Sequence, residues 1–244
     1  MNKLLFSLVL LAIVSSCNKE DAPDMFKTTG AITKETRVVN GFTQLDIDDN
    51  VNVIIHQDSI NQHVEVVAGK NLLPKITTTL EGNILKIRNN NKWNFMRSYK
   101  YEIDVHIYTP QLTKIEYAGG GDIKSANRLQ FPSLTLLTEG GGSDVLLDLQ
   151  CDSLFAILHT GVSNLYLTGN SNFTYLYSAG MSICHTENLI SNDVHVNNAS
   201  SGDFYVNATN SLLVEIESFS TTWYRGNPAL TIFKIGTGDV KPLQ

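Results

Sequence analysis

Short segments in which apolar and polar residues alternate run through most of the chain after residue 36. Clear examples are Phe42 to Ile47, Val51 to Ile55 and Tyr101 to Tyr108. Alternation of this kind is typical of β-strands with one buried face, and Gly, Asn, Asp and Ser separate the segments as turn residues do. Helical periodicity is almost absent from this part of the sequence. The pattern therefore predicts an all-β protein.

From residue 112 onward the pattern repeats about every 20 residues, with one period lacking its glycine near Thr222. The recurring glycines are Gly121, Gly142, Gly161, Gly180, Gly202 and Gly238. Pairs of apolar residues precede several of them at matching distances. A period near 20 predicts a parallel β-helix-like solenoid of about 20-residue coils. In such a solenoid Leu136 and Val196 share one column of inward aliphatic side chains.

The ends of a solenoid need protection against pairing with other strands. We expect residues 37–110 to continue or cap the solenoid at one end, and Pro242 to help terminate the other. The glycine-poor coil at residues 219–223 predicts a bulge or a packing change. Residues 37–243 are thus expected to form one β-solenoid domain.

The N-terminus has the pattern of an export signal. Lys3 precedes the apolar run Leu4 to Val14, which is too short to span a bilayer and has the length of a signal-peptide core. The segment Val14-Ser15-Ser16-Cys17 resembles the lipobox of bacterial lipoproteins. The resemblance implies cleavage after residues 1–16 and lipidation of Cys17, so that acyl chains attach the protein to the membrane. A plain secretory leader is the alternative.

Residues 17–36 are polar and are expected to form a lipidated flexible tether. Within them Asn18-Lys19-Glu20-Asp21 resembles the surface-export signal of Bacteroidetes lipoproteins. This resemblance implies an outer-membrane lipoprotein exposed at the cell surface. A solvated charge cluster on the tether is the alternative.

Several segments of the domain together resemble one protein family. They are Arg37 to Phe42, Leu45 to Ile47, Val51 to Ile55, Asn71 to Pro74, Tyr108 to Leu112 and Gly120 to Ile123. Their order and spacing are similar to those of the DUF2807 family, the putative auto-transporter adhesin, head GIN domain proteins of Bacteroidetes. The resemblance covers roughly residues 37–243. It implies a parallel β-helix-like fold in a cell-envelope protein, and it supplies no catalytic residues.

The charge distribution narrows the range of partners. The formal net charge of −6 disfavours nucleic acid. Between Leu129 and Tyr224 there is no Lys or Arg at all, whereas Asp and Glu recur. Anionic uronic acid polymers would be repelled by such a surface, and lyase chemistry would lack a basic group. Neutral glycans, cations and basic protein surfaces remain compatible.

The sequence contains no motif for a catalytic centre, a cofactor or a metal site. Asp122, Asp144, Asp203 and Asp239 are expected on one column with Asn164 between them. Stacked carboxylates can serve glycoside hydrolysis or bind Ca²⁺, but we interpret each as a cap for its own turn. Of the remaining cysteines, Cys151 and Cys184 are expected to be free, buried thiols, although export would permit a disulfide.

Aromatic side chains are the strongest binding candidates. The set is Tyr166, Tyr175, Tyr177, Tyr205, Trp223 and Tyr224. Those that face outward could stack on sugar rings or anchor a protein contact, whereas the others would fill the core. Ser59 and Ser153 stand in tripeptides that resemble the Bacteroidetes O-glycosylation acceptor, and modification requires exposure.

The sequence thus favours a non-catalytic envelope lipoprotein with adhesin-like binding of a glycan or a protein at the cell surface. A scaffolding envelope protein without a small ligand is the first alternative. A carbohydrate-active β-helix enzyme acting on neutral glycans is the second.

Overall fold

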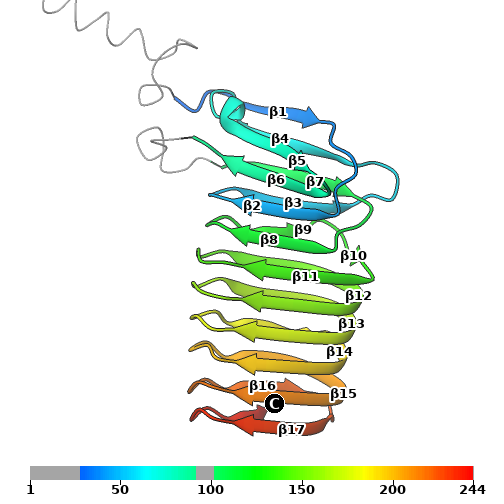
Figure 1. Ribbon diagram of the computed structural model, residues 1–244, viewed down its shortest axis with the longest axis vertical. Coiled ribbons are helices and arrows are strands. Elements are labelled where there is room, and N and C mark those ends of the chain that lie inside the picture. The colour runs from blue at the N-terminus through cyan, green and yellow to red at the C-terminus, as the bar shows by residue number, and fades with distance from the viewer. Residues whose placement is uncertain (1–27, 92–101, 244) are drawn as a thin grey trace, which may run out of the picture.

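The computed structural model describes residues 28–91 and 102–243, and the chain forms a rod of stacked β-coils (Figure 1). The proposed signal peptide at residues 1–16, Cys17 and the tether up to residue 27 lie outside the described residues. Within the described part no helix is long and apolar enough to cross a membrane. The rod has two broad faces, which we call the front face, turned toward the viewer in Figure 1, and the back face.

The central coils are long strands that bend once. They are β12 (Asp144–Leu158), β13 (Asn164–Ser178), β14 (Cys184–Asn198) and β15 (Phe204–Ile216). They pair in parallel, with Val145 opposite Leu165 and Leu154 opposite Thr174, so that equivalent residues lie 20 positions apart. The first half of each strand belongs to the back face and the second half to the front face. The predicted solenoid of about 20-residue coils is confirmed.

Shorter strands continue both faces on either side of the central coils. They are β8 (Lys114–Ala118), β9 (Ile123–Ser125), β10 (Leu129–Gln130), β11 (Ser133–Thr138), β16 (Thr222–Arg225), β17 (Ala229–Lys234) and β18 (Val240–Pro242). On the front face β8 and β11 precede β12, and β17 follows β15. On the back face β9 precedes β12, while β16 and β18 follow β15.

The N-terminal part continues the solenoid and then caps it. The strands in this part are β1 (Ile32–Arg37), β2 (Gln44–Asp48), β3 (Asn52–Gln57), β4 (His63–Gly69), β5 (Ile76–Glu81), β6 (Ile84–Asn89) and β7 (Asp104–Thr109), with a 3₁₀ turn η2 (Leu73–Lys75). Strands β2, β3, β6 and β7 pair in parallel with the coils, whereas β1, β4 and β5 pair antiparallel. The antiparallel strands close this end, as expected. Strand β1 begins inside the stretch 17–36 that was expected to be tether, so the folded part starts before residue 37.

The core consists of columns of aliphatic side chains that run along the rod. One column contains Leu136, Ala156, Leu176, Val196 and Val214, which pair successively and are all fully buried. Burying one large aliphatic side chain contributes roughly 1.5–3 kcal/mol. Since a single coil has no second layer to cover its inward side chains, the stacked coils are stable only together.

The glycines at the turn between successive coils occupy two columns rather than the single register expected from the sequence. Gly141, Gly161 and Gly180 form the first, in which each carbonyl accepts a backbone hydrogen bond from the next coil at 3.0–3.1 Å. Gly202 and Gly238 belong to the second, where a Cβ would collide with the carbonyl of the coil before. Gly121 also belongs to the second column, Ser143, Ser163, Ser182 and Ser220 fill its remaining places, and Gly142 stands between the two columns. The two columns lie close enough in sequence to look like one.

Serines also replace glycine in the glycine-poor coil at residues 219–223. The Ser220 hydroxyl donates to the Ser200 carbonyl at 2.7 Å and contacts Asn198 Oδ1 at 3.0 Å. Of the two predicted alternatives, the bulge is wrong, because β15 and β16 pair in continuous register, whereas the packing does change, since the coil is two residues shorter and serines replace glycine. The register shifts lie one and two coils earlier, between β13 and β14 and between β14 and β15.

Candidate binding surface

Four aromatic side chains form a stacked ladder on the back face. Tyr166, His185, Tyr205 and Trp223 occupy equivalent positions in β13 to β16. Successive ring centroids lie 5.0, 4.9 and 6.5 Å apart, and the planes are within 6°, 5° and 9° of parallel. The Nζ atom of Lys241 continues the ladder 5.8 Å from the Trp223 centroid. Each ring face is covered by its neighbour, so this ladder offers solvent mainly ring edges and stabilises the stack.

The aspartate column lies beside this ladder and connects neighbouring coils. Asp203 Oδ1 accepts the backbone N–H of Thr221 at 2.8 Å, and Oδ2 accepts the indole N–H of Trp223 at 3.0 Å. In the same column Asp144 Oδ1 accepts the side-chain amide of Asn164 at 3.1 Å, and Asn164 Oδ1 accepts the next backbone N–H at 3.2 Å. These side chains bind the following coil instead of capping their own turn.

The ends of this column are neutralised by lysines. Asp122 forms an ion pair with Lys124 at 2.9 Å, and Asp239 pairs with Lys241 at 3.0 Å and Lys234 at 3.2 Å. The two lysines lower the pKa of Asp239. Among residues 28–91 and 102–243 no group of three or more His, Cys, Asp and Glu is arranged to hold a metal ion.

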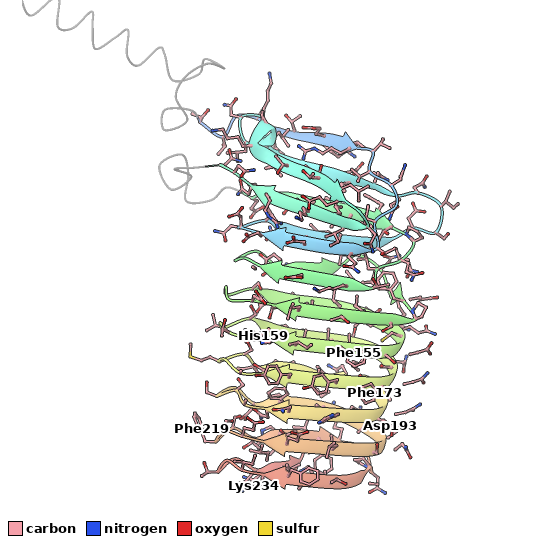
Figure 2. All side chains as sticks on the ribbon, in the orientation of Figure 1. Phe155, His159, Phe173, Asp193, Phe219 and Lys234 are labelled. Atoms are coloured by element: carbon pink, nitrogen blue, oxygen red, sulfur yellow. The ribbon has the colours of Figure 1, made fainter. Side chains whose placement is uncertain are left out.

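The front face carries aromatic rings that do not cover one another. Phe155 is tilted by 59° against Phe173 and by 47° against Tyr175, with centroids 5.8 and 6.4 Å apart. Edge-to-face contacts join Tyr175 to His195 at 5.0 Å and Tyr177 to His159 at 5.8 Å. Figure 2 shows Phe155, Phe173 and His159 on this face. Tilted rings leave part of their faces open to a ligand.

Hydrogen-bonding groups lie directly beside these rings. His195 Nε2 is 2.6 Å from Glu215 Oε1, and the Asn197 amide lies 3.3 Å from a carboxylate oxygen of Glu215 and of Glu217. Partial burial and the Glu215 charge raise the pKa of Tyr175. We call the surface formed by Phe155, Phe173, Tyr175, Tyr177, His195, Asn197 and Glu215 the front-face patch.

The six aromatic residues predicted from the sequence are therefore divided among three environments. Tyr175 and Tyr177 belong to the front-face patch, and the back-face ladder contains Tyr166, Tyr205 and Trp223. Tyr224, in β16, packs against the core one strand before the end of the back face. Phe155 and His195 were not among the predicted residues, although both lie 20 positions from Tyr175. That spacing is the signal that could have identified them.

The two predicted O-glycosylation sites differ in how exposed they are. Ser59 is exposed in a turn that Asp58 stabilises by accepting the backbone N–H groups of Ile60 and Asn61 at 2.9 and 3.0 Å. Ser153 is half-buried in β12 and is followed by the fully buried Leu154. Only the Ser59 tripeptide is fully accessible in the folded chain.

Both described cysteines are buried free thiols. Burial raises the pKa of Cys151 and of Cys184, so neither is poised to react as a thiolate. Cys184 points inward while its neighbour His185 joins the back-face ladder, as alternation along a strand requires.

A polar hollow of about 400 Å³ lies at the bend between the two faces. Its side chains include a ladder in which Asn172 donates to Asp152 at 2.9 Å and Asn192 donates to Asn172 at 3.2 Å. Because the Asn172 and Asn192 amides are engaged in this ladder, they are less free to bind a ligand in the hollow. It is a weaker candidate for ligand binding than the front-face patch.

Three histidines that are distant in sequence gather around Tyr108 near the cap. The rings of His56 and His63 each stack on Tyr108 with centroids 4.3 Å apart, and His56 Nε2 lies 2.9 Å from His106 Nδ1. Burial and the neighbouring His106 lower the pKa of His56. The sequence spacing of these histidines indicated no cluster, because the strand pairing of β3, β4 and β7 brings them together.

The fold is a parallel β-solenoid with an aromatic ladder on one face and an aromatic patch on the other. The chain belongs to the DUF2807 family, described as "Putative auto-transporter adhesin, head GIN domain", which matches residues 41–228. The family's description thus names adhesion rather than catalysis, and it is consistent with a protein of the cell surface or envelope. No curated protein matches the sequence.

Solved structures share this fold. A putative adhesin from Bacteroides fragilis NCTC 9343 is 21% identical, with a TM-score of 0.79 over 87% of this chain and 97% of that chain. From Parabacteroides distasonis ATCC 8503, a putative adhesin is 16% identical with a TM-score of 0.67, and a putative lipid binding protein is 17% identical with a TM-score of 0.68. Each of these two covers 88% of this chain and 98% of its own. At these identities the similarity concerns the fold.

Proposed function

We propose that this protein is a non-catalytic, surface-exposed lipoprotein of the outer membrane that acts as an adhesin by binding neutral glycans. The observation that carries the proposal is the front-face patch. Open aromatic faces beside a carboxylate, an imidazole and an amide suit a ligand with both C–H faces and hydroxyl groups, as in sugars. The absence of Lys and Arg from Leu129 to Tyr224 disfavours acidic glycans.

Membrane attachment in this proposal is through Cys17. Palmitate labelling of cells tests it: wild-type protein should incorporate the label, and Cys17→Ser protein should not. Protease treatment of intact cells tests orientation. Loss of the domain supports surface exposure, whereas survival on intact cells and loss only after lysis would place it in the periplasm.

Glycan binding is tested with an array of neutral and uronic acid polysaccharides. We expect binding to neutral glycans, and a loss of tenfold or more in affinity for Tyr175→Ala and Tyr177→Ala. Tyr166→Ala and Tyr205→Ala are matched controls, because these tyrosines occupy the back-face ladder. An equal loss in the controls, or binding restricted to uronic acids, would refute the assignment of the patch.

A scaffolding role without a small ligand is the second candidate. The back-face ladder favours this role, because its rings stack on one another and leave little ring surface for a partner. If no glycan binds the wild-type protein while the front-face variants keep full stability, the scaffold becomes the better explanation.

A further inference from the structure

The C-terminal end of the rod is not capped. All six residues of β17 are exposed, and the apolar side chains Leu230, Ile232 and Phe233 are 40%, 44% and 59% exposed. Leu230 and Ile232 are the last members of the two inward columns that contain Leu212 and Val214. Among the strands that the structure describes, β17 pairs only with β15, and β18 pairs only with β16. Each therefore has one free edge that can accept another strand.

The opposite end is built differently. There the edge strand β1 is antiparallel to β4 and carries Lys34, Glu35 and Arg37 in place of an apolar row. Charged residues on an edge strand oppose pairing with another chain. The N-terminal cap and β17 lie at opposite poles of the rod (Figure 1). The apolar free edge is thus at the pole that is distant from the N-terminus.

Once residues 1–16 have been removed, as the proposed function requires, the segments on either side of the described strands are too short to reach the C-terminal end. The back face stacks from β1 to β18 and, at about 4.8 Å per step, is roughly 48 Å long. A chain of the length of residues 17–27 spans at most about 37 Å from Thr28. Residues 92–101 connect β6 and β7 at the capped end, and a loop of this length returns within about 18 Å. The unpaired edge of β17 is therefore open to a strand from a second molecule.

A second copy of the chain fits this edge. In β17 the inward residues are Leu230 and Ile232, with Thr231 between them. Antiparallel pairing centred on Thr231 places Leu230 of one copy opposite Ile232 of the other, and the reverse, so both apolar ends are covered at once. This is the self-complementary arrangement that a two-fold axis requires. On the back face Lys241 and Pro242 restrict pairing of β18, which leaves β17 as the main contact.

We propose that β17 is a homophilic docking edge through which two copies join end to end. The inference deepens the proposed adhesin function and depends on its N-terminal anchor. In the resulting pair the two N-termini lie at the far poles, roughly 100 Å apart. Two chains anchored in apposed membranes, on neighbouring cells or vesicles, can then hold those membranes together through their free ends.

Charge at this end predicts how the contact responds to salt. Arg225, Lys234 and Lys241 outnumber Asp239, the acid that pairs with both lysines. Two like ends repel weakly, and salt screens that repulsion while leaving apolar contact intact. Association between copies is expected to strengthen from 10 to 150 mM NaCl. Binding of this basic end to an acidic surface would instead weaken as the NaCl concentration rises.

Cysteine cross-linking tests the pairing and its register. The test uses residues 18–244 with an N-terminal histidine tag, so that Cys17 is absent and Cys151 and Cys184 are buried. Thr231→Cys should form a disulfide-linked dimer under mild oxidation, because Thr231 would face its own copy within disulfide distance. Val162→Cys, at an exposed turn position away from β17, should stay monomeric. Equal cross-linking of both variants, or none of Thr231→Cys, would refute the register.

Vesicle clustering tests the bridging role. The same protein on neutral nickel-chelating phosphatidylcholine vesicles should cluster them, as measured by light scattering, and should sediment as a dimer at micromolar concentration. Leu230→Lys with Ile232→Lys should reduce clustering at least tenfold. The control Val162→Lys replaces a side chain of matching exposure, 45% against 44% for Ile232, and should cluster normally.

Monomeric wild-type protein that leaves vesicles dispersed would overturn the inference. Clustering that survives the double substitution would also overturn it, and clustering only after addition of a second protein would assign the edge to another partner. The front-face variants Tyr175→Ala and Tyr177→Ala should still cluster vesicles. Failure of glycan binding and failure of end-to-end pairing are therefore distinguishable.

Discussion

Leu136 and Val196 lie in one inward column, three coils apart, connected through Ala156 and Leu176. All four side chains are fully buried. The column therefore transmits a packing defect in one coil to the coils on either side, because each coil contacts little besides its two neighbours.

Val196→Asp should destabilise the protein by more than about 3 kcal/mol, because it buries a charge that has no partner in an aliphatic column. Urea unfolding followed by circular dichroism measures the change. Val162→Asp, at a 45% exposed position, is the control and should stay close to wild type. Near-wild-type stability of Val196→Asp would contradict the position of the core.

Gly141→Ala should cost more than about 2 kcal/mol. Gly141 has φ +79°, and an added Cβ would collide with the Gly119 carbonyl of the preceding coil. Its neighbour Gly140 has φ +68° with open space around the Cβ position, so Gly140→Ala should cost only about 1 kcal/mol through backbone strain. Thermal unfolding of both variants compares the two effects. Equal costs would show that close approach of the coils is unimportant.

Asp203→Ala should lower the unfolding free energy by about 1–3 kcal/mol, because it removes the acceptor for two N–H groups of the next coil. Asp203→Asn keeps one acceptor oxygen and should lose less. In a Trp93→Phe background the fluorescence of Trp223 should also shift when the indole loses its partner. An unchanged spectrum in Asp203→Ala would argue against this hydrogen bond.

The raised pKa of Tyr117 leads us to expect that the protein loses stability at high pH. Burial raises the pKa of Tyr117 to about 12, and its hydroxyl oxygen accepts the Gly121 N–H at 2.5 Å. A pKa that folding raises stabilises the protein fully below about pH 10, the value in the unfolded chain, and this contribution disappears as the pH rises through 12. A shift of this size corresponds to about 2–3 kcal/mol.

Urea unfolding of wild type and Tyr117→Phe at pH 8, 10 and 11.5 isolates this contribution. The variant lacks the ionisable group, so the stability difference between the two proteins should shrink above pH 10. Other tyrosines titrate equally in both proteins and cancel in the comparison. A constant difference across this range would mean that the Tyr117 hydroxyl ionises freely.

The coil period could be predicted because it equals the separation of equivalent residues along the sequence. Leu136 and Val196 are 60 positions apart and share a column, as three periods of 20 require. The position of each glycine was harder to predict. A register shift between Tyr166 and Thr168 changes the spacing in one coil. Serine then replaces glycine in the first column at Ser200, so the glycine seen nearby, Gly202, belongs to the second column. Two turn columns that lie so few residues apart cannot be told apart by counting residues between glycines.

The binding surface could be predicted only in part. Strict alternation through one strand would place Tyr166 and Tyr175, nine positions apart, on opposite sides. Both point outward because β13 bends between them and its inward positions change parity, which the sequence pattern did not predict. Nor does it predict ring orientation. The 6° between Tyr166 and His185 and the 73° between Tyr175 and His195 follow from side-chain rotamers and neighbours in the next coil. That difference separates the structural ladder from the front-face patch.

The stacking of whole strands also determines how the rod bears mechanical load. Tension along its axis pulls on every hydrogen bond between two coils at the same moment, since these bonds lie parallel to the force. A chain held at one pole and pulled through its broad face shares the load in this way. Force applied at Leu243 would instead peel β18 and then β17 from their edges, one bond after another. The rod should therefore resist axial tension applied through its broad face far better than pulling on its C-terminal tail.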